Sequence, residues 1–261
     1  MKKNLYLTLL LGLSALLASS CSVYEEITFH KDGQMSYNMT IDGGDFMKML
    51  SESKSSSSGK VSDSIISFAQ ILESEKMDMV NGYPEMEDDV ENMRPLFFRT
   101  VENHQTGEFK ISIFGDFKDT DAFNKAFKSM VNLASNTKDM DVDIEGMPAT
   151  GKRDGKDMIE WLAYFPEYQW DGKTMKRTID TSKSKISEDE DTPSNKDPFS
   201  DWKSFFQGGK MSVKYHFPNK VDAVDDPNAM LSQDGKTVII EYPASVFTTS
   251  PKDADIEIKL K

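Results

Sequence analysis

The sequence contains a single cysteine, Cys21, so no disulfide can form within the chain. It contains three histidines, His30, His104 and His216, which are far apart in the sequence and do not form an HExxH pair. The GxSxG elbow of hydrolases and the GxxxxGK[ST] phosphate loop do not occur either. These absences remove the common catalytic signatures, and we predict a non-enzymatic protein that needs no cofactor.

Positive charge is also scarce. The chain has 31 Lys and Arg against 44 Asp and Glu, and its formal net charge is −13. Such an excess of negative charge repels nucleic acid, so a nucleic-acid partner is not expected. Hydrophobic residues make up 38% of the chain, and sixteen Phe and sixteen Met supply enough apolar volume for a folded core.

The chain has one long apolar segment, which lies at its N-terminus. Lys2 and Lys3 precede an almost uninterrupted apolar run from Leu5 to Leu17. A membrane-spanning helix needs about 20 apolar residues, so this run is too short to span a bilayer. A short positive segment, an apolar run and small residues after it are typical of a secretory signal peptide.

The end of this segment, Leu17-Ala18-Ser19-Ser20-Cys21, resembles the lipobox of bacterial lipoproteins. Ala18 departs mildly from the Leu that this family most often has there. The resemblance implies cleavage between Ser20 and Cys21 and a diacylglyceryl group, usually with an N-acyl chain such as palmitate, on Cys21. Several acyl chains attach a protein stably to a membrane without a spanning helix. We therefore expect a lipid-anchored protein of the cell envelope.

An acidic pair, Glu25-Glu26, follows the cysteine closely. This arrangement is similar to the surface-export signals of lipoproteins from Bacteroidetes. It favours the outer membrane and leaves the choice between the periplasmic and the outer face open.

Alternating apolar residues and turn signals predict several β-strands in the remainder of the chain. A first hairpin is expected over residues 22–42, with its turn at His30-Lys31-Asp32-Gly33. Further strands are expected at 95–101, 108–117, 158–165, 168–179 with a bend at Asp171-Gly172, 211–217, 237–242 and 254–260.

Helical spacing predicts a smaller number of helices. One is expected from Val61 to Leu72, with Ser62 or Asp63 as its cap, and a second follows the cap Asp119-Thr120 with an apolar stripe as far as Ala134. The fold class is therefore α+β, with mostly antiparallel hairpins and a few packed amphipathic helices.

We divide the chain into four parts by composition. Residues 1–20 are the lipoprotein signal peptide, and residues 21–181 form an α+β ectodomain. Residues 182–198 form a polar, acidic loop or linker. Residues 199–261 form a β-rich C-terminal part, which either stands alone or completes the same domain.

The order of these segments is similar to that of a known group of proteins. A cysteine leads at once into a strand, a Lys31-Asp32-Gly33 turn and a second strand, and two short segments near the C-terminus, 215–221 and 232–238, have matching hairpin chemistry. This order resembles uncharacterised lipoproteins of flavobacteria and other Bacteroidetes, and more distantly the LppM-type lipoprotein domain of mycobacteria. The resemblance implies a β-rich ectodomain at the cell envelope and brings no catalytic residues.

An aromatic cluster is the best candidate for partner binding. It consists of Trp161, Tyr164, Tyr168 and Trp170, with Phe165 among them and Trp202, Phe205 and Phe206 later in the chain. Flat aromatic faces stack on sugar rings or anchor protein interfaces. Because side chains alternate along a strand, about half of the cluster would point into a core, and packing in the core is the other interpretation.

An acidic repeat near residue 140 is a weak calcium candidate. Asp141, Asp143 and Glu145 match the first three oxygen ligands of an EF-hand loop, and Gly146 occupies its sixth position. The bidentate carboxylate required at the twelfth position is replaced by Lys152, so a regular site is incomplete. The other interpretation is a solvated loop or strand edge.

Taken together, these features predict a membrane-tethered envelope lipoprotein with a binding or structural role. Its expected partners are the membrane, through the lipid on Cys21, and an envelope protein or glycan. A carbohydrate-binding or carbohydrate-acting surface lipoprotein is the alternative, and it rests on the aromatic cluster and the many carboxylates.

Overall fold

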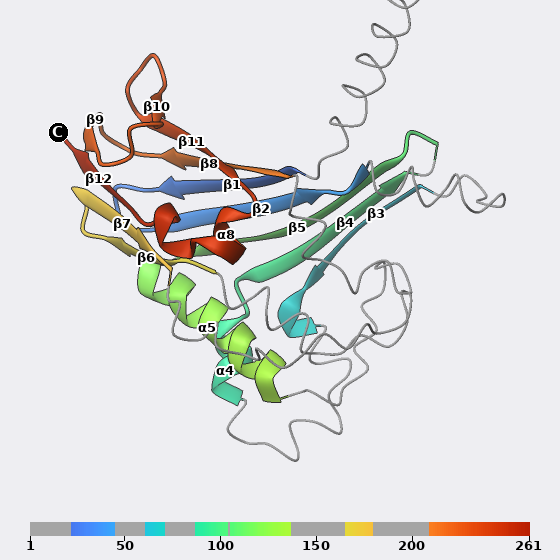
Figure 1. Ribbon diagram of the computed structural model, residues 1–261. Helices are drawn as coiled ribbons and strands as arrows, with labels where there is room; N and C mark the ends of the chain where they lie inside the picture. Colours follow the sequence, from blue (N-terminus) through green and yellow to red (C-terminus); the bar gives the residue numbers. More distant parts are fainter. Residues whose placement is uncertain (1–21, 45–60, 71–86, 104, 137–164, 180–208) are drawn as a thin grey trace, which may run out of the picture.

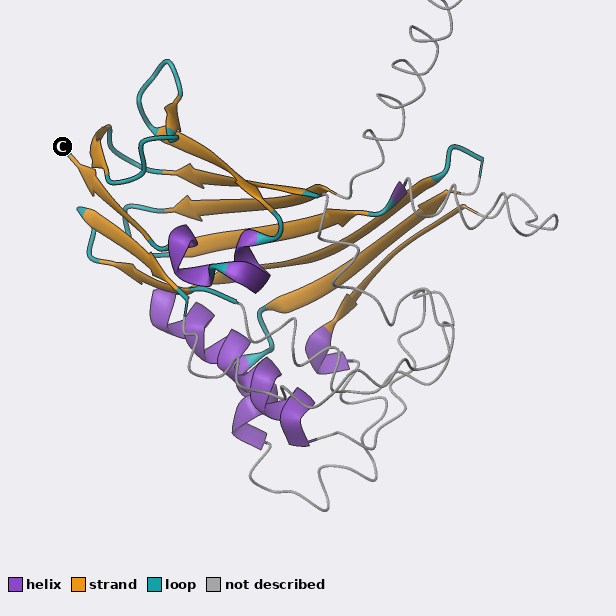
Figure 2. Cartoon of the chain, in the orientation of Figure 1, coloured by secondary structure: helices purple, strands orange, loops and turns teal. Residues whose placement is uncertain are grey.

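The computed structural model describes residues 22–44, 61–70, 87–103, 105–136, 165–179 and 209–261. Most of these residues belong to two β-sheets, one of eight strands and one of four. The helices lie to one side of the large sheet (Figure 1; Figure 2). Strand therefore predominates among the described residues, and helices are few, as the sequence predicts.

The eight-stranded sheet has the order β10-β11-β8-β1-β2-β5-β4-β3. Its strands are β1 (Ser22–Phe29), β2 (Met35–Asp42), β3 (Val61–Ser67), β4 (Leu96–Asn103), β5 (Glu108–Phe117), β8 (Lys210–His216), β10 (Met230–Leu231) and β11 (Thr237–Pro243). All neighbours pair antiparallel except β1 and β8, which run parallel. Strand β1 is therefore central, with a partner on each side, and it joins the N-terminal hairpins to the C-terminal strands.

The four-stranded sheet has the order β6-β7-β12-β9. Its strands are β6 (Glu167–Trp170), β7 (Thr174–Thr178), β9 (Val221–Val224) and β12 (Ile256–Leu260). The bend expected at Asp171-Gly172 is the turn between β6 and β7, and Gly172 adopts the positive φ of 90° that this turn requires. The C-terminal segment therefore supplies strands to both sheets.

The core lies on one face of the large sheet. Over β1 and β8, the four-stranded sheet covers it, and Phe29 contacts both Tyr168 and Phe217 there, with ring centroids 6.2 and 5.5 Å apart. Over β2 and β5, helix α5 (Thr120–Asn136) covers it, and Tyr37 packs on Phe123 at 4.9 Å. The shorter helix α4 (Glu87–Asn92) packs against α5, and α8 (Val246–Thr249) and the 3₁₀ helix η3 (Pro251–Ala254) precede β12.

Two local predictions are confirmed closely. The first hairpin forms over β1 and β2, and its turn holds Gly33 at a φ of 91°. Helix α5 begins at Thr120, and the Asp119 carboxylate accepts a hydrogen bond from the N–H of Ala122 at 2.7 Å, which caps the helix.

The helix predicted from Val61 to Leu72 is wrong. Residues Val61–Ser67 form strand β3, which pairs antiparallel with β4 along its whole length. The expected cap residue Asp63 instead binds Arg99 of β4 through two hydrogen bonds of 2.8 and 2.7 Å. Pairing with a neighbouring strand outweighs an apolar spacing of three to four residues, and the β-branched Val61 and Ile65 favour the strand. Among the described residues of this segment, which end at residue 70, only 68–70 are helical.

Candidate functional site

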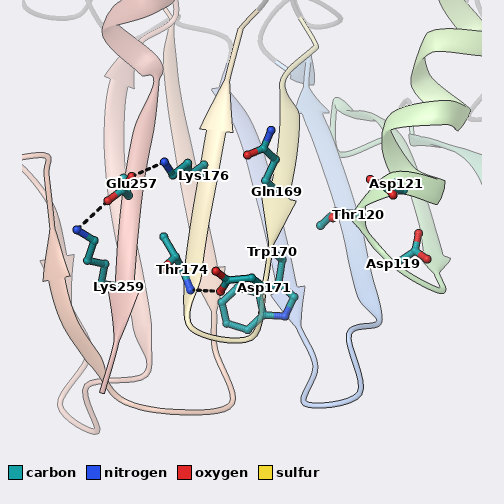
Figure 3. A pocket seen from close by; sticks show the side chains of 10 residues that line it. All are labelled: Asp119, Thr120, Asp121, Gln169, Trp170, Asp171, Thr174, Lys176, Glu257 and Lys259. Carbon is teal, nitrogen blue, oxygen red and sulfur yellow. Dashed lines mark hydrogen bonds and ion pairs between the residues drawn. The ribbon is translucent and has the colours of Figure 1, made fainter.

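A polar hollow of about 600 Å³ lies beside the outer face of the four-stranded sheet (Figure 3). Strands β6, β7 and β12 supply most of its lining, and the first residues of α5 form another wall. The lining residues are Asp119, Thr120, Asp121, Gln169, Trp170, Asp171, Thr174, Lys176, Glu257 and Lys259. The hollow thus combines four carboxylates, two lysines, an amide and one indole.

Strand alternation explains how these side chains come together. Gln169, Lys176 and Glu257 occupy matched positions on β6, β7 and β12. Their neighbours Tyr168, Met175 and Ile258 are buried, so the three polar side chains point to the opposite, solvent-facing side. The register of the small sheet therefore builds a polar row beside the start of α5.

Two lysines hold one carboxylate in this row. Glu257 forms ion pairs with Lys176 at 2.9 Å and with Lys259 at 3.0 Å, as Figure 3 shows. These contacts lower the pKa of the Glu257 carboxyl, with the hydrogen bond from Lys176 contributing most and that from Lys259 next. Glu257 therefore stays negatively charged at neutral pH.

A second carboxylate is held by the backbone. Asp171 accepts hydrogen bonds from the N–H groups of Thr174 at 2.6 Å and Lys173 at 2.8 Å. These two bonds, that of Thr174 first, lower the pKa of Asp171. A general acid at neutral pH needs a raised pKa, so Asp171 and Glu257 suit a charged lining rather than proton donation.

The aromatic residues predicted to bind a partner take different positions. Tyr168 is fully buried, as expected of a core residue, and its hydroxyl donates a hydrogen bond to Glu25 at 2.9 Å. Trp170 packs against Phe29 and Phe217 with ring centroids 5.2 and 5.9 Å apart, and part of it also lines the hollow. Trp161 and Tyr164 lie outside the described residues.

Other predicted positions also lie outside the described residues. They are the lipidation and cleavage positions Cys21 and Ser20, and the calcium candidates Asp141, Asp143 and Glu145. Within the described parts of the chain, no group of three or more His, Cys, Asp or Glu side chains is placed to hold a metal ion. Across those same parts, no helix is long and apolar enough to cross a membrane.

A buried ion pair lies between the two sheets. Glu25 of β1 and Arg177 of β7 approach to 3.3 Å, and their side chains are 1% and 0% exposed. Arg177 also donates to the carbonyl of Ala254 at 2.8 Å. Burial raises the pKa of the neighbouring Tyr37 well above its usual value, and the charge on Glu25 raises it further.

This burial changes the interpretation of the acidic pair Glu25-Glu26. Glu25 points into the core, whereas Glu26 is exposed and binds the His216 imidazole at 2.7 Å. The two carboxylates therefore lie on opposite faces of β1 and do not form one exposed acidic patch. In the folded domain, Glu25 therefore has a role in the core and Glu26 has a contact at the surface.

Sequence reasoning did not identify most of the hollow. Asp171 appeared only as a turn residue and Asp119 only as a cap, while Lys176, Glu257 and Lys259 carried no signal. Alternation within β7 and β12 would have placed these three side chains on outward faces. The pairing of two strands that are distant in the sequence was the missing information.

Comparison with known proteins gives little. No family model and no curated protein matches the chain. One solved structure, the NMR structure of the folded domain of the LppM protein from Mycobacterium tuberculosis, matches with 8% sequence identity and a TM-score of 0.34. The match covers 92% of this chain and 89% of that one. It is a distant likeness to a lipoprotein domain and carries no conclusion about function, and the resemblance to Bacteroidetes lipoproteins gains no support.

Proposed function

We propose that this chain is a lipid-anchored lipoprotein of the cell envelope, and of the outer membrane in particular, with a binding or structural role and no catalytic activity. The observation that carries the proposal is the junction between signal and fold. The lipobox-like stretch ends at Cys21, and the next residue, Ser22, is the first residue of β1. A cleavage before Cys21 would remove the export signal and leave the described sheets whole.

The hollow beside α5 supports a binding role. It offers positive charges, negative charges and uncharged polar groups. These suit a hydrophilic envelope component such as a protein segment. The carboxyl groups of Asp171 and Glu257 have lowered pKa values, and this favours recognition of a ligand over acid catalysis.

The anchor is tested by intact-mass spectrometry of the protein extracted from membranes. We expect a mass that lacks residues 1–20 and carries acyl chains on Cys21. The variant Cys21→Ser should lose the acyl mass and leave the membrane fraction. A wild-type protein with an unmodified cysteine would overturn the proposal. Protease treatment of whole cells then distinguishes the outer face, where the domain is cleaved, from the periplasmic face, where it is protected.

Carbohydrate binding is the second candidate function. Trp170 favours it, because an indole beside Gln169, Asp171 and Thr174 combines an apolar surface with hydrogen-bonding groups, as sugar sites do. Titration with soluble glycan fragments should change the tryptophan fluorescence, and Gln169→Ala should weaken the response. Gln105→Ala, in the exposed turn before β5, is the matched control. An equal response in both variants would remove this candidate.

A further inference from the structure

We propose that the end of the eight-stranded sheet at which β1 begins lies against the bilayer, so that β1 points away from the membrane. This orientation rests on the proposed lipid anchor at Cys21. The occupant of this surface is thus the lipid headgroup region around the protein's own acyl chains.

The chain connects the proposed lipid directly to strand β1. Ser22 follows Cys21 directly and is already paired on both sides, opposite Asp42 of β2 and Lys210 of β8. One extended residue spans at most about 3.6 Å. The proposed lipid is therefore attached one residue before the start of the central strand β1. No linker lies between them through which the domain could turn freely.

The charges at this end of the sheet are of both signs. A row of residues aligned with Ser22 runs across the strands of the large sheet. Its charged members are Lys210, Lys110, Asp42 and Asp63. These charges balance, whereas the whole chain carries −13. Glu102 of β4 and Glu108 of β5 lie one and two residues beyond this row, and Glu108 is paired with Lys110 at 2.7 Å. This end therefore carries only a small negative charge, and it meets less repulsion at an anionic membrane surface than the strongly acidic chain as a whole would.

Two exposed apolar side chains lie near this end of the sheet, one on β1 and one on β3. Tyr24 is 50% exposed although it belongs to a central strand, and it lies about 7 Å along β1 from Ser22. Val61 is 61% exposed and lies two residues beyond the row of Ser22 on β3. Tyrosine is enriched at the level of lipid headgroups, so Tyr24 suits this position.

The orientation places the hollow away from the membrane. Phe29, at the other end of β1, lies seven residues from Ser22, or roughly 23 Å along the strand. Trp170 of the hollow packs directly on Phe29. The hollow therefore faces partners that stand in the aqueous space above the membrane, not the lipids themselves.

The test uses full-length, lipidated protein in phosphatidylcholine vesicles. Lys210→Cys places a thiol in the row of Ser22, and Lys31→Cys places one in the turn beyond Phe29. Both lysines are exposed, and both variants lose the same charge. Because acylation blocks Cys21, each variant has one thiol that reacts with a fluorophore. Quenching is then measured with a nitroxide carried on the lipid headgroup, which acts only at short range.

We expect quenching of the probe at position 210 to exceed that at position 31 several-fold. Equal quenching at both positions, or stronger quenching at position 31, would overturn the orientation. The intact mass of the same samples separates two kinds of failure. Acylated protein with equal quenching refutes the orientation alone, whereas a Cys21 without acyl chains refutes the anchor and the orientation with it.

Discussion

Glu25 and Arg177 meet at 3.3 Å in the interior, although 152 positions separate them in the sequence. The pair connects β1 of the large sheet to β7 of the small one. The Tyr168 hydroxyl of β6 also donates to Glu25, and Arg177 also donates to the Ala254 carbonyl of η3, so the small sheet and the helix before β12 each add a hydrogen bond to the pair. A buried pair with this support fixes how the two sheets pack on each other.

Replacing one member of this pair should destabilise the fold strongly. In Glu25→Gln, Arg177 keeps its charge in a site that is 0% exposed and loses its carboxylate partner. Removing one partner of a buried pair costs about 3–5 kcal/mol, and we expect this loss in the free energy of unfolding measured with urea.

Two further variants make this measurement specific. Glu26→Gln, on the exposed face of the same strand, should change the free energy of unfolding by less than about 1 kcal/mol. The double variant Glu25→Leu/Arg177→Met removes both charges and should be more stable than Glu25→Gln. A double variant less stable than the single one would show that the pair itself contributes more than its desolvation costs.

The local features of this fold were predictable and the long-range ones were not. The hairpin β1–β2 and the cap of α5 depend on a few adjacent residues, such as Gly33 and Asp119. The parallel pair β1–β8 and the Glu25–Arg177 contact join distant segments, and a single sequence carries no sign of which strands meet. The same gap hid the hollow, where only Trp170 was a candidate beforehand.

Alkaline pH should destabilise the protein through its buried tyrosines. Burial raises the pKa of Tyr242 from 10.0 to about 12. The unfolded chain therefore loses this proton first, and stability falls as pH rises from 10 towards 12. Tyr242→Phe should show a smaller fall in the free energy of unfolding over this range. Tyr24→Phe changes a side chain that is 50% exposed, and its free energy of unfolding should fall over this range as much as that of the wild type. Identical profiles for the wild type and Tyr242→Phe would contradict the prediction.

Gly115→Ala should be costly for steric reasons. A Cβ at this position of β5 would lie 2.2 Å from the carbonyl oxygen of Pro95, a backbone atom that cannot simply rotate away. Overpacking of this kind costs about 1–3 kcal/mol or more, and we expect the upper end in thermal or urea unfolding. Gly33→Ala is the comparison, because its Cβ meets nothing within 4 Å and only the φ of 91° is strained. The prediction fails if Gly33→Ala proves the more destabilising of the two.

Asn124 connects helix α5 to β6, one of the strands that line the hollow. Its side-chain oxygen accepts the N–H of Tyr168 at 2.9 Å, and its amide donates to the Tyr168 carbonyl at 2.8 Å. Asn124→Ala leaves both part-buried backbone groups without these partners, which costs about 1–3 kcal/mol, offset slightly by the better helix propensity of Ala. Hydrogen exchange should therefore accelerate at the Tyr168 amide. Lys125→Ala, the exposed neighbour on the same helix, should leave that amide protected, and equal exchange in the two variants would show that packing alone holds β6 against α5.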